Sequence, residues 1–171
     1  FDIVTWTGDD TARTLAHSLS AVPEFIMLKQ RSGTRDWATY HASTGNGQYM
    51  NLNANGGSSA SSTHWNSTTP TSSVFSVGTS NQVNEDTETY VGYLFAPKQG
   101  FSAMGSYTGN GNADGPFIYT GFRPSLVITK MTDGSDSWLL FDNKRLTYNT
   151  TGYALLAHSN IAELTGYPTD I

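Results

Sequence analysis

The 171-residue chain contains no cysteine, and only 13% of its residues are charged. The absence of cysteine excludes a disulfide framework and every thiolate metal site. Lysine and arginine number 9 against 14 aspartates and glutamates, so the formal charge is -5 and no basic stripe can neutralise a row of phosphates. No apolar run approaches the roughly 20 residues that span a bilayer. We therefore expect no nucleic-acid partner and no membrane insertion.

Small polar residues are in excess instead. Serine (19), threonine (23), asparagine (12) and glycine (17) account for 71 of the 171 residues. The residues that fill the faces of long amphipathic helices are scarce, whereas Thr, Tyr, Phe, Trp and Val favour half-buried pleated surfaces. An all-helical protein is therefore excluded, and a turn-rich β protein is expected.

An internal repeat organises the chain. A shift of 101 residues aligns residues 7–41 with residues 108–142 without a gap, and seven of the 35 aligned positions are identical. The identical pairs are Thr7/Thr108, Gly8/Gly109, Ala12/Ala113, Pro23/Pro124, Lys29/Lys130, Gly33/Gly134 and Trp37/Trp138. We therefore predict two copies of one β unit.

Runs of apolar, aromatic and β-branched residues at matched positions predict the strands. Each copy has an opening run that ends at a Thr-Gly turn, a buried run that begins at a proline, and a run that begins at a tryptophan and returns as the hairpin partner. These runs are residues 1–6, 23–29 and 37–41 in the first copy and residues 101–107, 124–130 and 138–142 in the second. Val74–Val77 and Tyr90–Phe95 predict two further strands in the first copy.

The two units differ in length. The first unit spans residues 1–100, with a polar loop at 51–73, whereas the second spans residues 101–171 and is 29 residues shorter. The second unit has no counterpart of Val74–Val77 or Tyr90–Phe95, and a sheet without its closing strands has an unpaired edge. We therefore predict an all-β fold of two antiparallel, sandwich-like or barrel-like units, the second truncated at its C-terminus. Either the chain is a fragment or another chain completes the second unit.

Several stretches resemble a known family. The stretch Ser106–Lys130, SYTGNGNADGPFIYTGFRPSLVITK, and the first-unit stretches Arg13–Leu19, Pro23–Lys29 and Thr89–Pro97 are similar to an uncharacterised two-repeat β domain of bacteriophage structural proteins, often from marine phages. The resemblance covers essentially the whole chain. It implies a virion protein such as a tail or head fibre, a capsid decoration protein or an adhesin, and it brings no catalytic motif.

Residues with catalytic or metal-binding chemistry form no recognisable pattern. The histidines lack the i,i+2 or i,i+4 spacing of strand or helix metal sites; they are His17, His41, His64 and His158. The acidic clusters at Asp9–Asp10, Glu85–Glu88 and Asp133–Asp136 are interpreted as solvated turns. No Gly-x-Ser-x-Gly elbow is present. We expect no catalytic residue, no metal, no cofactor and no enzymatic activity.

The aromatic residues are the remaining candidates for binding. Trp65 in the polar loop, together with Tyr49 and Tyr107, is the set we predict to bind a glycan or receptor, because ring faces pack on the C–H faces of sugars. The alternative for Trp65 is packing of the loop itself. Trp37 and Trp138 recur at matched positions and are interpreted as core anchors.

These observations lead to one functional hypothesis and two alternatives. We expect a structural protein of a bacteriophage virion that contacts other virion proteins and copies of itself, as a homo-oligomer such as a trimer, and that attaches to a host-surface glycan. The first alternative is a carbohydrate-binding module of a secreted bacterial protein. The second is a glycan depolymerase, which would need two suitably spaced carboxylates.

Overall fold

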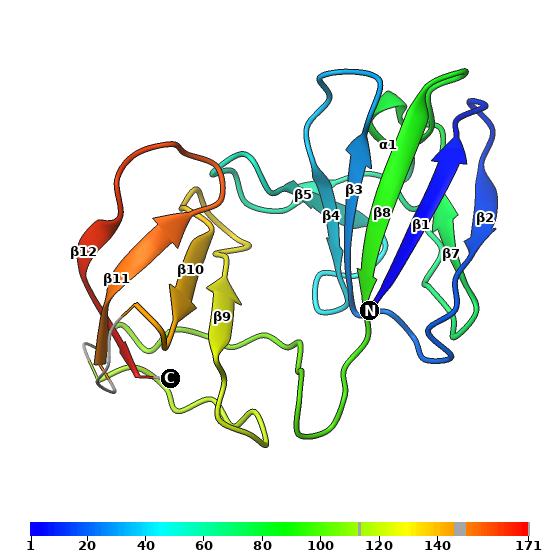
Figure 1. The fold of residues 1–171 in the computed structure, drawn as a ribbon. Coiled ribbons are helices and arrows are strands. Elements are labelled where there is room, and N and C mark those ends of the chain that lie inside the picture. The colour runs from blue at the N-terminus through cyan, green and yellow to red at the C-terminus, as the bar shows by residue number, and fades with distance from the viewer. Residues whose placement is uncertain (113, 146–149, 171) are drawn as a thin grey trace.

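The computed structural model describes residues 1–112, 114–145 and 150–170 of the chain as two β lobes (Figure 1). The first lobe contains a six-stranded and a two-stranded sheet, and the second lobe contains a four-stranded sheet. The prediction of an all-β fold is therefore confirmed. The described helix α1 spans Asn81–Asn84, and no helix in the described part of the chain is long and apolar enough to cross a membrane.

The six-stranded sheet has the order β1-β8-β3-β4-β5-β6, and all of its neighbouring strands are antiparallel. These strands are β1 (Asp2–Thr7), β8 (Thr89–Phe95), β3 (Phe25–Gln30), β4 (Ala38–His41), β5 (Gln48–Asn51) and β6 (Ser59–Ala60). In the smaller sheet, β2 (Arg13–Ala16) pairs with β7 (Val74–Val77). Because β8 lies between β1 and β3, the last strand of this lobe in sequence is an interior strand of its sheet.

The core of the first lobe lies between its two sheets. Ile26 and Leu28 of β3 and Tyr90 of β8 are fully buried, which follows from the alternation of side chains along each strand. The ring of Trp6 stacks on Tyr90 with centroids 5.4 Å apart and meets Phe75 of β7 edge-on at 5.9 Å. Burial of each such side chain contributes roughly 1.5 to 3 kcal/mol to folding, so this cluster joins the two sheets.

The second lobe repeats part of the first. Its sheet has the order β12-β11-β10-β9, with β9 (Leu126–Thr129), β10 (Leu139–Asp142), β11 (Thr150–Leu156) and β12 (Leu164–Asp170). Ile26 pairs with Tyr40 in the β3–β4 hairpin, and Val127 pairs with Phe141 in the β9–β10 hairpin, a shift of 101 residues on both strands. The four strands β9–β12 therefore correspond to β3–β6 in order and direction.

The predicted opening strand of the second unit is not formed. Residues 101–107 contain no strand and make one isolated bridge, between Lys98 and Ser102. Their counterpart β1 is held by six residue pairs with β8, and the described part of the second lobe contains no strand in the position of β8. A single strand would leave its backbone groups unpaired, which is why this prediction was wrong. Ala113, one of the repeated alanines, lies outside the described residues.

The two lobes are in contact through strands β3 and β5 and through the loop that follows β5. Trp138 of the second lobe donates its indole N–H to the carbonyl of Asn51 at 2.9 Å, and its ring centroid lies 6.4 Å from that of Phe25. The backbone N–H of Ser58 donates to the carbonyl of Thr132 at 2.8 Å. The low-complexity loop is therefore ordered by the second lobe as well as by the first.

The repeated glycines Gly8 and Gly109 provide a test of how the two units differ. A Cβ added at Gly8 would lie 2.0 Å from the carbonyl oxygen of Glu85, whereas a Cβ at Gly109 meets no described atom within 4 Å. We predict that Gly8→Ala lowers the free energy of unfolding by roughly 1 to 3 kcal/mol, because backbone must move to relieve the overlap. The matched variant Gly109→Ala should change it by less than about 0.5 kcal/mol. Urea denaturation followed by tryptophan fluorescence measures the free energy of unfolding of each variant. Equal decreases in the two variants would contradict the proposed difference in packing at Gly8 and Gly109.

Candidate functional site

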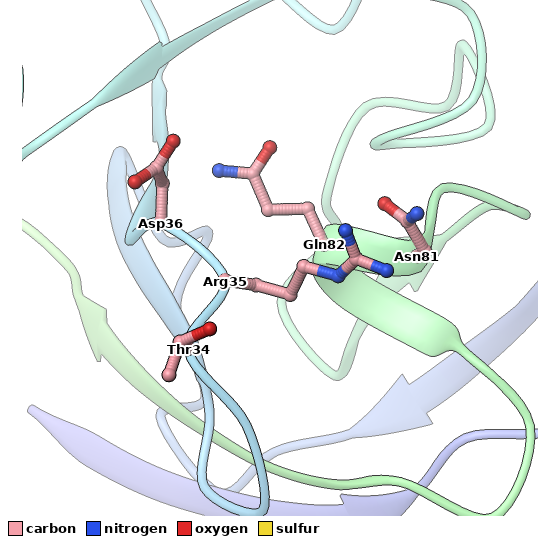
Figure 2. A pocket seen from close by; sticks show the side chains of 5 residues that line it. All are labelled: Thr34, Arg35, Asp36, Asn81 and Gln82. Carbon is pink, nitrogen blue, oxygen red and sulfur yellow. The ribbon is translucent and has the colours of Figure 1, made fainter.

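A polar pocket lies between the turn after β3 and helix α1. We call it the α1 pocket and define it by its lining residues, Thr34, Arg35, Asp36, Asn81 and Gln82 (Figure 2). Its volume is about 290 Å³, and the five side chains that line it are polar. Two segments separated by more than 40 residues in the sequence therefore meet at one surface cavity.

Local contacts hold both walls of the pocket. On one wall, the ammonium of Lys29 donates to the carbonyls of Gln30, Gly33 and Arg35 at 2.8, 3.2 and 2.7 Å, and these three bonds close the turn that carries Arg35. On the other wall, the hydroxyl of Ser80 accepts from the backbone N–H of Gln82 and caps the first turn of α1.

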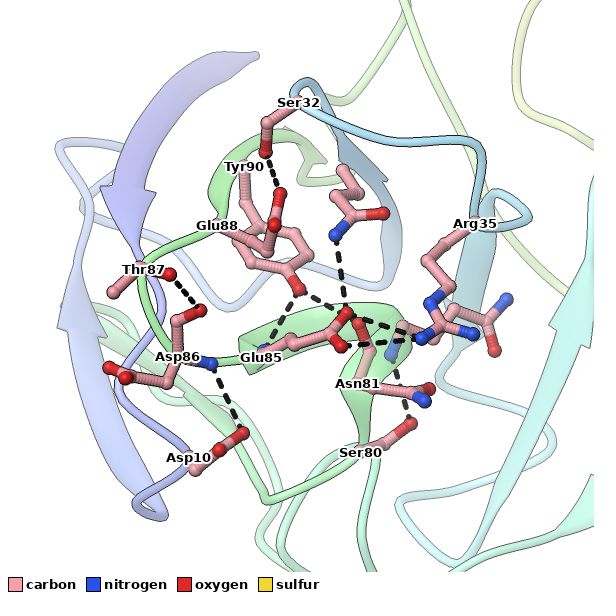
Figure 3. A network of polar contacts seen from close by, with 12 residues as sticks. Asp10, Ser32, Arg35, Ser80, Asn81, Glu85, Asp86, Thr87, Glu88 and Tyr90 are labelled. Carbon is pink, nitrogen blue, oxygen red and sulfur yellow. Dashed lines mark hydrogen bonds and ion pairs between the residues drawn. The ribbon is translucent and has the colours of Figure 1, made fainter.

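The interior strand β8 also supports helix α1. The hydroxyl of Tyr90 donates to the carbonyl of Asn81 at 2.8 Å and accepts from the backbone N–H of Glu85 at 2.9 Å (Figure 3). The ring of Tyr90 is fully buried in the core, and burial raises the pKa of its hydroxyl. The two ends of this four-residue helix are therefore anchored to one core side chain.

An ion pair joins the two walls. Arg35 lies 3.3 Å from both carboxylate oxygens of Glu85, and Glu85 also accepts from the side-chain amide of Gln30 at 3.4 Å (Figure 3). The Arg35 side chain is 44% exposed and the Glu85 side chain 35%, so the pair contributes less than about 1 kcal/mol to stability. The guanidinium of Arg35 therefore remains accessible at the mouth of the pocket.

Amide groups form the other side of the pocket. Asp36 accepts from the side-chain amides of Asn53 at 2.8 Å and Asn51 at 3.4 Å, and Gln82 donates to the side-chain oxygen of Asn51 at 2.6 Å. The pocket thus presents a guanidinium donor, a carboxylate acceptor and carboxamides within one small cavity. Such a set can form hydrogen bonds with a neutral ligand that is rich in hydroxyl groups.

His64 extends this network into the core. Its Nε2 donates to the side-chain oxygen of Gln82 at 2.9 Å, and its Nδ1 accepts from the hydroxyl of Ser61 at 2.7 Å. The ring of Tyr49 stacks on the imidazole with centroids 3.7 Å apart. Burial lowers the pKa of His64, although the hydrogen bond with Gln82 acts in the opposite direction. His64 therefore has the environment of a neutral structural histidine.

The aromatic residues predicted to bind a glycan are not gathered in one place. Trp65 is 2% exposed, donates its indole N–H to the carbonyl of Gln48 at 2.8 Å and packs edge-on against Tyr40, so its ring belongs to the core. Tyr49 is half-buried, and its ring stacks on His64. Tyr107 is 55% exposed and lies in the segment that leads to the second lobe. The structure brings Trp65 and Tyr49 into one cluster and places Tyr107 elsewhere.

Asp9 and Asp10 stabilise loops through an ion pair and hydrogen bonds. Asp9 forms an ion pair with Arg13 at 3.1 Å, and the hydrogen bond from the backbone N–H of Thr11 is the main cause of its lowered pKa. Asp10 accepts from the backbone N–H of Asp86 at 3.2 Å (Figure 3). Among the described residues, no group of three or more His, Asp or Glu side chains could hold a metal ion.

Sequence reasoning missed the residues of the α1 pocket. Arg35 and Asp36 follow a glycine turn, and Asn81 and Gln82 follow a serine that can cap a helix; both are weak local signals. Their convergence depends on the pairing of β3 with β8, which no local pattern reveals.

Comparisons with known proteins add one finding. A family model described as a domain of unknown function, DUF7483, matches residues 1–171. No curated protein and no solved structure matches the chain.

Two histidines, the half-buried His41 and the buried His64, predict how stability depends on pH. Burial lowers the pKa values of His41 and His64 below 6.5, so the unfolded chain binds protons more readily than the folded one below that pH. We predict that the free energy of unfolding is constant near neutral pH and falls as the pH drops below about 6.5. The pKa values of Asp2 and Asp9 are also lowered. Protonation of these two carboxylates lowers the free energy of unfolding further, but only at still lower pH.

The variants His64→Gln and His41→Gln/His64→Gln test this assignment. Urea titrations between pH 4.5 and 7.5 should show a shallower slope for the single variant and little slope for the double variant. An unchanged slope in the double variant would refute the assignment to these histidines.

Proposed function

The chain belongs to the DUF7483 family of domains of unknown function, and we propose, on the resemblance given in the sequence analysis and not on this membership, that it is a structural protein of a bacteriophage particle, of the tail-fibre, head-fibre or capsid-decoration type. Its role is to make assembly contacts with copies of itself and with other virion proteins, without catalysis and without a cofactor. The resemblance of Ser106–Lys130 and Thr89–Pro97 to phage structural proteins supports this proposal, and the distribution of exposed apolar side chains supports the assembly role.

The observation that carries the proposal is the difference between the two halves of the chain. Among the residues whose side chains the structure describes, thirteen large apolar side chains are exposed; three precede residue 101, and ten follow residue 100. The ten are Phe101, Tyr107, Phe117, Ile118, Tyr119, Leu126, Ile128, Met131, Leu155 and Ile161. Every member of the main core cluster, by contrast, lies between Trp6 and Leu94. Apolar surface concentrated on one part of a protein is typical of a contact with another protein.

The architecture explains this difference. In the first lobe, the β2–β7 sheet covers the large sheet and contributes Phe75 and Val77 to the core. In the second lobe, the described residues supply no comparable second sheet, so β9–β12 remain a single layer. Such a layer buries its apolar face only when another element packs on it, and a neighbouring protein in an assembly can supply that element.

A second candidate function is binding of a hydroxyl-rich ligand such as a host-surface glycan, and the α1 pocket favours it. Arg35 and Asp36 provide a donor and an acceptor at the same cavity, with Asn81 and Gln82 opposite them. This role suits a carbohydrate-binding module as well as a virion protein that attaches to a host. A glycan depolymerase is the less favoured alternative, because Asp36 and Glu85 are both engaged in the contacts that shape the pocket.

The assembly role predicts a change in self-association. Phe117 and Ile118 are 90% and 47% exposed, and burial of each would contribute roughly 1.5 to 3 kcal/mol to association. The double variant Phe117→Ser/Ile118→Ser should therefore weaken self-association by at least about tenfold, measured by sedimentation velocity over a range of concentrations. The control Ile3→Ser/Val22→Ser, which changes exposed apolar residues of the first lobe, should associate like the wild type. The proposal would be contradicted if the wild type stayed monomeric at all concentrations. It would also be contradicted if the control variant lost as much self-association as Phe117→Ser/Ile118→Ser.

Glycan binding makes a separate prediction. Thr34 and Asn81 are exposed at the mouth of the α1 pocket, so Thr34→Ala/Asn81→Ala removes polar groups there at little cost to the fold (Figure 2). A glycan that the wild type binds on an array should bind this variant about tenfold more weakly, and Asn160→Ala, an exposed asparagine of the second lobe, should leave binding unchanged. Equal binding by all three proteins would exclude the pocket. Release of shorter sugars from the bound polysaccharide would instead indicate a depolymerase.

A further inference from the structure

Three asparagines of the chain are followed directly by glycine, and this dipeptide can react with itself. They are Asn46, Asn55 and Asn110. The backbone nitrogen of the glycine can attack the side-chain amide carbon of the asparagine, because glycine has no Cβ to hinder the approach. The attack needs an asparagine side chain that is free to rotate and a glycine nitrogen that is not held in a hydrogen bond. The contacts of each asparagine therefore decide which of the three reacts.

Hydrogen bonds restrain two of the three side chains. The amide of Asn46 donates to the hydroxyl of Thr69 at 2.8 Å. Asn110 is held at both ends of its carboxamide, because Nδ2 donates to the carbonyl of Asp114 at 3.1 Å and Oδ1 accepts from the backbone N–H of Asn112 at 3.0 Å. These bonds must break before either carboxamide can turn towards the glycine nitrogen that follows it.

The side chain of Asn55 is unrestrained. It is exposed and forms no hydrogen bond with any described residue. Gly56 is exposed as well, and a Cβ added to it would meet no described atom within 4 Å. Both residues lie between β5 and β6, outside any strand, and the N–H of Gly56 donates to no acceptor in the described part of the chain. The nitrogen and the amide carbon that must meet are therefore both free to move.

Lys130 acts on the peptide group that joins these two residues. This half-buried lysine donates from its ammonium to the carbonyl of Asn55 at 3.3 Å and to that of Met131 at 2.6 Å. The Asn55 carbonyl and the Gly56 N–H belong to one peptide group. A cation bound to this carbonyl stabilises the negative charge that the group acquires when its nitrogen loses a proton. The contact with Lys130 therefore makes the Gly56 nitrogen a better nucleophile.

The loop that follows this dipeptide is held against the second lobe. The backbone N–H of Ser58 donates to the carbonyl of Thr132 at 2.8 Å, and the Ser58 hydroxyl donates to the same carbonyl at 2.9 Å. A Cβ added at Gly57 would lie 2.7 Å from that carbonyl oxygen. Because the backbone fits so closely here, a change in its length at residues 55–56 would displace the Ser58 contact.

We propose that Asn55 is a site of spontaneous modification of the folded chain, at which Lys130 promotes attack of the Gly56 nitrogen on the Asn55 side chain. The nitrogen bonds to Cγ of Asn55, and the bond from Cγ to the amide nitrogen breaks. The proton lost by Gly56 passes through solvent to the departing nitrogen, which leaves as ammonia. One water molecule then opens the resulting succinimide ring at either of its carbonyls. The products are aspartate and isoaspartate at position 55.

The two products differ in their effect on the contact between the lobes. Aspartate leaves the backbone unchanged and places a carboxylate on the residue whose carbonyl binds Lys130. Isoaspartate directs the main chain through the side-chain carbon and adds one methylene group before Gly56. Only the longer backbone displaces Ser58 from Thr132, so the isoaspartate form has the weaker contact between lobes.

Peptide mapping of the aged protein tests the site. The folded chain is incubated in mildly alkaline buffer, and mass spectrometry follows the replacement of NH₂ by OH in each peptide. We expect Asn55 to convert at least about fivefold faster than Asn46 and Asn110, whose hydrogen bonds must first break. In concentrated urea the three rates should become similar. Equal rates in the folded chain, or faster conversion at either of the other two sites, would overturn the proposal.

Two matched variants test the role of Lys130. Lys130→Gln removes the positive charge beside Asn55, whereas Lys144→Gln removes the same charge from an exposed side chain of the second lobe. The first should slow conversion of Asn55 by at least about threefold in the folded chain and leave the rate in urea unchanged. The second should change neither rate. A rate that is unchanged or raised in Lys130→Gln would refute this role, and circular dichroism shows whether both variants are folded.

Hydrogen exchange tests the effect on the contact between lobes. The isoaspartate form is isolated from aged protein by ion-exchange chromatography, and Asn55→Asp provides the same charge without the added methylene. Exchange of the Ser58 backbone N–H should be at least about tenfold faster in the isoaspartate form than in the unmodified chain. The variant Asn55→Asp should exchange like the unmodified chain. Unchanged exchange in the isoaspartate form would contradict the displacement of Ser58, whatever the rate of its formation.

Discussion

The structure depends on one constraint, that a strand forms only where it has a partner. Strand β8 satisfies this constraint for the first lobe, because it lies between β1 and β3 and contributes Tyr90 and Leu94 to the core. The 101-residue shift places residues 103–108 opposite β1 and residues 114–117 opposite β2, but the partner strands β8 and β7 have no described counterparts in the second unit. Neither segment forms a strand, and the one opposite β2 also contains Gly115 and Pro116, which disfavour a strand. The strands β9–β12, which pair among themselves, do form.

The α1 pocket depends on the same strand. Tyr90 of β8 bonds to both ends of α1 through its hydroxyl, and this fixes Gln82 and Asn81 opposite the turn that carries Arg35. The network continues from Gln82 to His64, which connects the surface of the pocket to the packed aromatic residue Trp65 of the loop after β6. A polar surface site and an apolar core therefore share one support, so changes in the core are expected to alter the pocket.

Strands β3 and β5 of the first lobe cover one tryptophan of the second lobe. Trp37 of the first lobe stacks on Tyr93 of β8 with ring centroids 6.1 Å apart. Its repeat counterpart Trp138 has no such strand beside it among the described residues; it bonds to Asn51 and lies against Phe25 of the first lobe. The contact between the lobes thus covers one residue of the incomplete sheet, while Leu126 and Ile128 stay exposed. This partial cover explains why the apolar surface is concentrated in the second half.

The sequence alone determined the local part of this picture. Alternation and prolines located β3, β7 and β8 to within two residues, and the repeat correctly predicted the hairpin β9–β10 from the hairpin β3–β4. Only the tertiary structure decided that residues 101–107 form no strand, that Trp65 is core and that the α1 pocket exists. The physical reason is that propensity and side-chain alternation act between near neighbours, whereas strand pairing, the burial of a ring and the closure of a pocket require residues distant in sequence to meet.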